Sequence, residues 1–274
     1  MNLDRRDFLI QSGQMALGVL ALSLDRWTFR HSPMTELEKQ LVLLMKEHRV
    51  PGVSLAVIRG GELAERRTFG VKDAASEAPV DDATMFEAAS MSKPVFAYAV
   101  LKLCERGVLD LDTPLTKYTS SRFLEGDPRL DLITARQVLS HTTGFPNWRS
   151  KSRPLAIAFT PGTRWSYSGE GYSYLQSVIT ELTKVPIEEY MRVNILEPFG
   201  MTSSGYVWND TFAAKMARPH AEDGAPLENK RSTAADVARY ASAGALLTTP
   251  TDYAKFMLEI LGMPAITRAS TAFH

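Results

Sequence analysis

The chain has 274 residues, 45% of them hydrophobic, which suffices for one large domain or two interlocked lobes and excludes a wholly disordered protein. Its 31 basic residues balance its 31 acidic ones, and no basic stripe indicates nucleic acid as a partner. Cys104 is the only cysteine, so the chain can form neither an internal disulfide nor a metal site built from several cysteines.

The first 30 residues have the pattern of an export signal. Arg5-Arg6 precede a short apolar run from Met15 to Leu24, which is typical of a twin-arginine signal. The run is too short to cross a bilayer comfortably, so we expect no stable membrane span and a periplasmic or secreted protein. The alternative is a basic amphipathic helix at the start of a cytosolic protein. We assign residues 1–30 to the signal and residues 31–274 to one domain.

A helix and a hairpin are predicted next. Apolar residues recur at helical spacing from Met34 to Arg49. The runs Val53 to Ile58 and Glu62 to Val71 flank Gly60-Gly61, a pattern typical of a β-hairpin. Because a lone hairpin is marginally stable in water, these strands need further partners, and the sequence shows no obvious ones.

The rest of the chain is predicted to be mostly helical, with long loops over residues 78–88 and much of 110–161. The segment from Pro94 to Arg106 is apolar nearly all round, which is typical of a buried helix. Further helices are predicted over Thr134–Ser140, Glu170–Thr183, Pro186–Phe199, Asp236–Leu247 and Thr251–Leu261.

A Ser-x-x-Lys tetrad, Ser90-Met91-Ser92-Lys93, precedes the buried helix. A lysine three residues after a serine lies on the same helical face. Burial lowers the pKa of an ammonium group, and such a lysine can take the proton that makes serine a nucleophile. The spacing alone is expected on the order of once by chance in a chain of this length. The alternative is an N-cap serine with an exposed lysine one turn later.

Three other segments bear on chemistry. Tyr167 could shuttle protons as phenol or phenolate beside a cation such as Lys93, or could be a buried tyrosine near a turn. His141 is predicted to be structural, because no Gly-x-Ser-x-Gly elbow supports a Ser–His mechanism. Asp110 and Asp112 indicate a capped turn rather than a metal pair. No metal motif or phosphate loop is present in the sequence, so no cofactor is expected.

Taken in order, these segments resemble the serine β-lactamase and penicillin-binding-protein superfamily. Within it, they most resemble the class C β-lactamase, D-Ala-D-Ala carboxypeptidase and esterase group. The order and spacing of the segments make this resemblance far more specific than any one motif. The matching segments are Val50–Val57, Phe86–Lys93, Leu109–Pro114, Ile133–Gly144, Pro161–Leu175, Glu197–Met201 and Ala243–Thr249.

The resemblance implies an α+β fold of the β-lactamase/transpeptidase type, with a helical lobe and an antiparallel sheet lobe. It implies Ser90 as the acylated nucleophile, Lys93 as its proton partner and Tyr167 as the general base of a Tyr-x-Asn motif. The Ser90 backbone N–H would form half of an oxyanion hole. The substrate would be a small molecule or peptide with an ester or amide bond: a β-lactam, a D-Ala peptide or a small ester.

Two departures from the family pattern qualify these implications. Gly169 stands where the family has the asparagine of Tyr-x-Asn, which favours an ester or a substrate held by other contacts. No Lys-Thr-Gly or His-Thr-Gly follows Tyr167, so the C-terminal strands of the family sheet are expected to be missing. The hairpin would then keep an unpaired edge unless a partner chain or another packing completes the sheet.

We therefore expect a C-terminally truncated chain, or a natural product that ends early, with low activity and low stability. The main hypothesis is an exported β-lactamase-like serine hydrolase that needs no cofactor. The competing hypothesis is a non-catalytic or degenerate homologue that keeps Ser90, Lys93 and Tyr167 but lacks the third active-site motif.

Overall fold

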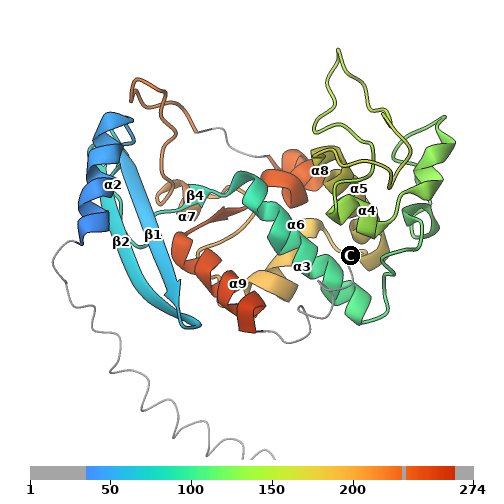
Figure 1. Cartoon of the computed structure of the whole chain (residues 1–274), viewed down its shortest axis with the longest axis horizontal. Helices are drawn as coiled ribbons and strands as arrows, with labels where there is room; N and C mark the ends of the chain where they lie inside the picture. Colours follow the sequence, from blue (N-terminus) through green and yellow to red (C-terminus); the bar gives the residue numbers. More distant parts are fainter. Residues whose placement is uncertain (1–34, 230–232, 263–274) are drawn as a thin grey trace, which may run out of the picture. The chain divides into compact units, whose positions relative to one another are not determined.

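The computed structural model describes residues 35–229 and 233–262 (Figure 1). The predicted export signal, residues 1–30, lies outside this range. The described residues divide into two units between residues 44 and 45. The first described helix, α2 (Glu36–Glu47), confirms the helix predicted before the hairpin. Thr35 and Glu38 cap its start, each side chain bonding the backbone N–H of the other residue.

The predicted hairpin is confirmed within residues 45–274. Strands β1 (Gly52–Arg59) and β2 (Glu62–Asp73) pair antiparallel, and the two-residue strand β3 (Ala78–Pro79) lies on the far edge of β2. At one end of the pair Gly70 has a φ of +69°, and a Cβ there would lie 2.0 Å from the Pro51 carbonyl oxygen. Only glycine fits this close approach. Among the described residues, β1 pairs with β2 alone.

A second ladder corrects the loop predicted over residues 78–88. Besides β3, this segment contains β4 (Phe86–Glu87), which pairs antiparallel with β5 (Leu247–Thr248). The two strands are about 160 residues apart in the chain, and each is only two residues long. Strands of two residues are too short to show an alternation of apolar and polar side chains. Tertiary packing decides which segments pair.

Most of the remaining elements are helical. Helices α3 (Ser92–Glu105), α5 (Gly169–Thr183) and α8 (Ala234–Gly244) pack together, and α9 (Pro250–Gly262) packs against β1 and β2 (Figure 1). The others are α4 (Ala135–Leu139), α6 (Ile187–Met191), α7 (Asp210–Ala213), the 3₁₀ helices η2 (Ala89–Met91), η3 (Leu115–Lys117) and η4 (Pro128–Leu132), and the π-helix η5 (Arg192–Leu196).

The core lies among these helices. Fully buried side chains include Phe96 on α3 and Leu175 on α5, each of which contributes about 1.5–3 kcal/mol by leaving water. Among the described residues, no helix is both long and apolar enough to cross a membrane. The architecture is α+β, as expected.

Most helix predictions hold, but two differ from the structure. The helix expected over residues 186–199 is divided into α6 and the π-helix η5, and it ends at Leu196. The helix expected over residues 236–247 begins at Ala234, where Thr233 and Asp236 form a capping box, and ends at Gly244. Leu247 belongs to β5 instead. The sequence Leu-Leu-Thr-Thr continues the apolar pattern of the helix, so periodicity alone could not show that the chain becomes extended there.

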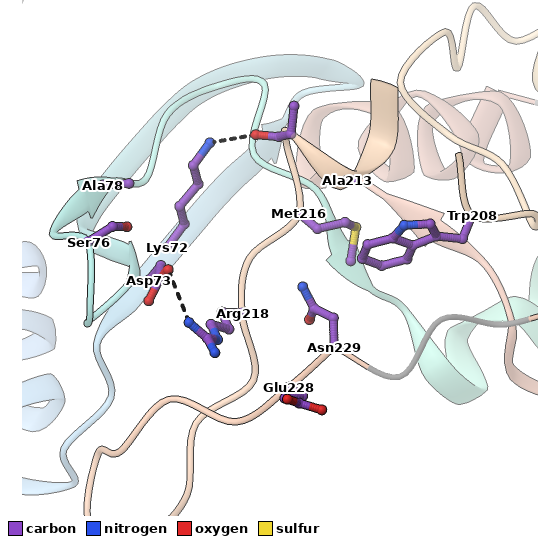
Figure 2. A pocket seen from close by; sticks show the side chains of 11 residues that line it. Lys72, Asp73, Ser76, Ala78, Trp208, Ala213, Met216, Arg218, Glu228 and Asn229 are labelled. Atoms are coloured by element: carbon purple, nitrogen blue, oxygen red, sulfur yellow. Dashed lines mark hydrogen bonds and ion pairs between the residues drawn. The ribbon is translucent and has the colours of Figure 1, made fainter. Parts of the chain in front are cut away.

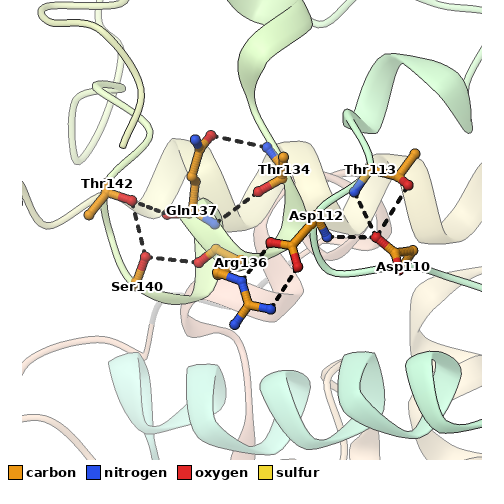
Figure 3. A network of polar contacts seen from close by, with 8 residues as sticks. All are labelled: Asp110, Asp112, Thr113, Thr134, Arg136, Gln137, Ser140 and Thr142. Carbon is orange, nitrogen blue, oxygen red and sulfur yellow. Dashed lines mark hydrogen bonds and ion pairs between the residues drawn. The ribbon is translucent and has the colours of Figure 1, made fainter. Parts of the chain in front are cut away.

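A polar network orders the segment that leads to α4 (Figure 3). The Asp110 carboxylate accepts hydrogen bonds from the backbone N–H groups of Asp112 and Thr113, at 2.8 and 2.9 Å. Asp112 in turn accepts two bonds from Arg136, at 2.6 and 2.8 Å. Both carboxylates are therefore used to hold a turn, which confirms the capped-turn prediction.

Candidate active site

Ser90 lies in the 3₁₀ turn η2, directly before α3, and its side chain is exposed. Lys93 is in the first turn of α3 and is only 4% exposed. The Lys93 Nζ lies 3.3 Å from the Ser90 Oγ and donates a hydrogen bond to it. The tetrad thus has a buried lysine in contact with its serine, rather than the exposed lysine of the N-cap alternative.

The second serine of the tetrad holds the turn in place. The Ser92 Oγ donates to the Ala89 carbonyl at 2.6 Å and accepts from the Leu246 N–H at 3.0 Å. The Ala88 N–H also donates to the Leu246 carbonyl, at 2.8 Å. Ala89 has a φ of +46°, which is costly for a residue with a Cβ. The chain directly before Ser90 is therefore strained and tied to the strand that leads into β5.

Lys93 is surrounded by acceptors that carry no formal charge. Besides Ser90, its ammonium donates to the Ala243 carbonyl at 2.6 Å. It also lies 4.8 Å from the ring centre of Tyr167 and 5.6 Å from that of Tyr172. Across residues 35–229 and 233–262, no carboxylate forms an ion pair with it. A buried charge without a counter-ion is expensive, and such groups cluster at functional sites.

Tyr167 completes the cluster. Burial acts to raise the pKa of its phenol, but hydrogen bonds with Lys93 and Ser90, together with the Lys93 charge, outweigh burial and lower the pKa below its usual value. Tyr172, the other ring beside Lys93, has its pKa raised by burial and stays a neutral phenol. The structure thus brings together all three residues that the sequence singled out, Ser90, Lys93 and Tyr167.

His141 packs beneath Tyr167, a contact that the sequence did not reveal. The two ring centres are 4.4 Å apart. The His141 carbonyl accepts from the Ser166 N–H at 2.8 Å, and its Nδ1 accepts from the Ser168 N–H at 3.1 Å. Burial, with a smaller effect from the Lys93 charge, lowers the pKa of His141 and favours the neutral ring that can accept this bond. His141 therefore holds the backbone on both sides of Tyr167.

The backbone of His141 explains its position. It follows α4 in the left-handed region, with a φ of +58°. Its N–H bonds to the Val138 carbonyl and the next N–H, of Thr142, bonds to the Gln137 carbonyl, which is a Schellman helix end. Glycine is usual at this place, so no local signal in the sequence marks a histidine here as the neighbour of Tyr167.

Gly169, which stands where the family motif has an asparagine, is covered by Trp148. A Cβ at Gly169 would lie 2.7 Å from the Cη2 of Trp148 and 2.8 Å from the Asn147 carbonyl oxygen. The Gly169 N–H donates both to that carbonyl and to the Asn147 side-chain oxygen, each at 3.1 Å. No local signal in the sequence marks Trp148 as a site residue, because its neighbour Gly169 lies 21 residues further along the chain.

A hollow of about 590 Å³ lies elsewhere in the molecule (Figure 2). Its lining includes Lys72, which donates to the Ala214 carbonyl, and Arg218, which pairs with Asp73. None of Ser90, Lys93 and Tyr167 lines it. We place the candidate active site at the Ser90 cluster, because nucleophilic chemistry requires a nucleophile and a base in contact, which volume alone does not supply.

The fold is that of the β-lactamase and penicillin-binding-protein class of proteins. The chain belongs to the Beta-lactamase family, whose model matches residues 37–272.

Individual relatives are similar at moderate identity. Esterase EstB of Burkholderia gladioli is 30% identical over 198 residues, which cover 60% of this chain and 49% of the esterase. The solved D-alanine carboxypeptidase AmpC of Burkholderia cenocepacia is 24% identical, with a TM-score of 0.71 over 84% of this chain and 66% of that one. An octameric penicillin-binding protein homologue from Pyrococcus abyssi is 26% identical, with a TM-score of 0.68 over 81% of this chain and 55% of that one. The chain thus spans about half the length of the curated esterase that it matches.

Proposed function

We propose that this protein is a serine hydrolase that cleaves small esters through an acyl-enzyme on Ser90. The observation that carries the proposal is the buried Lys93, whose ammonium has no carboxylate partner among the described residues and donates to the Ser90 Oγ at 3.3 Å. An ammonium that contacts both a serine hydroxyl and a tyrosine stabilises the phenolate that takes the serine proton. The family and the fold support the same class of reaction.

Tyr167 takes up and returns the protons that the reaction moves. As the Ser90 Oγ bonds to the ester carbonyl carbon, its proton passes to the Tyr167 phenolate, whose charge the neighbouring Lys93 ammonium balances. The carbon–oxygen bond to the alcohol then breaks, and the alcohol leaves with that proton. Water attacks the acyl group on Ser90 and gives up a proton to Tyr167, and the acid leaves as Ser90 is reprotonated. The lowered pKa of Tyr167 makes its phenolate available at less alkaline pH.

The start of α3 stabilises the negative charge that develops on the carbonyl oxygen of the ester. Ser90 lies in the turn that precedes this 14-residue helix, so the positive end of the helix dipole faces the site of attack. The Ser90 N–H is proposed as one donor to the oxyanion.

An ester is favoured over a β-lactam or peptide as substrate. The residue two positions after Tyr167 is Gly169, which offers no side-chain amide to bind the amide group of a peptide. The similar protein of Burkholderia gladioli is named an esterase. Ester alcohols are also better leaving groups than amines, so they make smaller demands on the proton donor.

The test is to incubate the purified 274-residue chain with p-nitrophenyl butyrate and, separately, with a cephalosporin, and to look for an acyl mass on the Ser90 peptide. We expect a butyryl adduct with the ester, and its loss in Ser90→Ala. Lys93→Ala and Tyr167→Phe should each lower kcat/KM by about 100-fold or more.

Ser152→Ala, at an exposed serine, is the matched control and should keep the adduct. An adduct that survives Ser90→Ala would sink the assignment of the nucleophile. A folded protein that reacts with neither compound would instead support the degenerate-homologue hypothesis.

A further inference from the structure

Trp148 occupies the space that a side chain at position 169, two residues after Tyr167, would fill. Ser168 is extended, with φ −137° and ψ 115°, so the side-chain positions of residues 167 and 169 point to the same side of the chain. Residue 169 is glycine, and the Trp148 atoms Cη2 and Cζ2 lie 2.7 and 2.8 Å from where its Cβ would be. The indole therefore lies on the side of the backbone to which Tyr167 points.

The indole also reaches α8. Trp148 and Tyr240 meet edge to face, with ring centres 6.2 Å apart and an interplanar angle of 72°. Tyr240 precedes by three residues Ala243, whose carbonyl accepts the hydrogen bond from Lys93. Trp148 thus spans two segments that each contribute a neighbour to Lys93.

The segment that carries Trp148 is anchored on both sides. The Asn147 carbonyl accepts the N–H groups of Gly169 and Glu170, both at 3.1 Å. Arg149 pairs with Glu170 at 2.6 Å, and the Glu170 side chain is only 2% exposed. These contacts fix the indole before any ligand arrives, so binding need not bear the entropy of ordering it.

The indole nevertheless remains open to solvent. Trp148 is 44% exposed, Met91 directly after Ser90 is 49% exposed, and Trp165 two residues before Tyr167 is 68% exposed. The nearest cation on this segment, Arg149, is already paired with Glu170. Apart from the buried Lys93, which already donates to Ser90 and Ala243, these residues offer apolar and aromatic surface to a ligand at Ser90.

We propose that Trp148 is the specificity-determining wall of the site and binds the apolar group of an uncharged ester. This inference rests on the proposed function, because it places the ester carbonyl at Ser90. A flat, half-exposed indole gains by covering an alkyl or aryl group, and its electron-rich face offers no counter-ion to a carboxylate. The apolar group belongs either to the acyl or to the alcohol part of the ester, and varying each part separately distinguishes the two.

The catalytic test compares two ester series in the full chain, in Trp148→Ala and in Trp148→Phe. One series varies the acyl chain from acetyl to hexanoyl on p-nitrophenol, and the other keeps acetyl and varies the alcohol from methyl to phenyl. The preference is the ratio of kcat/KM for the largest group to kcat/KM for the smallest. Trp148→Ala should lower this ratio by about 10-fold in one series, and Trp148→Phe should lower it by about threefold or less. The series that responds identifies the part of the ester that Trp148 contacts.

Leu132→Ala, at an exposed apolar residue on η4, is the surface control and should leave both preferences unchanged. Equal preferences in wild type and Trp148→Ala, with turnover still dependent on Ser90, would overturn the inference and leave the proposed function standing.

A binding measurement makes the inference independent of turnover. Hexyl p-nitrophenyl ether has no carbonyl and cannot acylate Ser90, so its binding can be followed by ligand-detected NMR. Wild type and Ser90→Ala should bind it equally, and Trp148→Ala about 10-fold more weakly. Failure of Trp148→Ala to weaken binding would contradict the role of Trp148, whether or not the protein hydrolyses esters.

Discussion

Two residues beside the cluster hold costly backbone conformations. Ala89 and His141 both have positive φ values, +46° and +58°, although neither is glycine. Each costs roughly 1–2 kcal/mol and persists only where the surroundings impose it. Ala89 directly precedes Ser90, and His141 packs against Tyr167. The two strained residues therefore lie where they orient the Ser90 nucleophile and the Tyr167 phenol.

Replacing His141 should impair catalysis more than folding. His141→Gly removes the strained side chain and the ring together, and His141→Asn keeps a left-handed residue with an acceptor but no aromatic face. We expect both variants to lose about 10- to 100-fold in kcat/KM, because a small displacement of Tyr167 is costly. Urea denaturation should show a much smaller loss for His141→Gly.

The pH profile of the His141 variants provides a second readout. Burial acts to raise the pKa of Tyr167, and its contacts with Lys93 and Ser90 lower it overall. If Tyr167 moves away from them, its pKa rises, and a phenolate base is then lost at pH values where the wild type retains it. The rising limb of kcat/KM should therefore shift to higher pH. An unchanged limb would mean that His141 does not position Tyr167.

At the level of elements, the Ser90 turn depends on pairing between distant segments. Strand β4 leads into η2 and pairs with β5, and the Ser92 hydroxyl bonds both the Ala89 carbonyl and the Leu246 N–H. Leu246 and Ser92 are fully buried. The Ser-x-x-Lys pattern indicates a chemical role for its first and last members, but only the structure shows that its second serine is a brace.

Ser92→Ala should therefore destabilise the protein. It leaves the buried Leu246 N–H without its acceptor, which costs about 1–3 kcal/mol. The free energy of unfolding in urea measures this loss, and Ser152→Ala at an exposed position is the control. Identical stability of Ser92→Ala and wild type would show that this hydrogen bond is not needed to hold the turn.

Across the whole molecule, a carboxylate on α5 holds a loop about 60 residues earlier in the chain. Glu181 accepts from the Ser120 N–H at 2.9 Å and the Ser120 hydroxyl at 2.7 Å, and Thr119 also donates to it. The Ser120 backbone bond, the hydroxyl bonds of Thr119 and Ser120 and a weaker one from Ser121 lower the pKa of Glu181 to about 2, against a small opposing effect of burial.

A depressed carboxyl pKa stabilises the fold above the pKa of the unfolded chain, which is near 4.5. This stabilisation should be complete at neutral pH and should fall away between pH 4.5 and about 2, as the carboxylate is protonated. Glu181→Gln should consequently unfold with a weaker dependence on pH over that range. The thermal midpoint measured at several pH values tests this, and an unchanged acid limb would contradict it.

The sequence alone determined the local and periodic features of this protein. The hairpin follows from alternating strands around Gly60-Gly61, most helices from apolar periodicity and caps, and the candidate residues Ser90, Lys93 and Tyr167 from ordered motifs. These signals are local, because propensity and periodicity act over neighbouring residues.

Only the tertiary structure decided the contacts between distant segments. The β4–β5 pairing, the contact of His141 with Tyr167 and the cover of Gly169 by Trp148 join residues between 21 and about 160 positions apart. The burial of Lys93 beside uncharged acceptors likewise depends on α8, which lies about 150 residues away. Such contacts arise when the chain packs as a whole, and no short pattern encodes them.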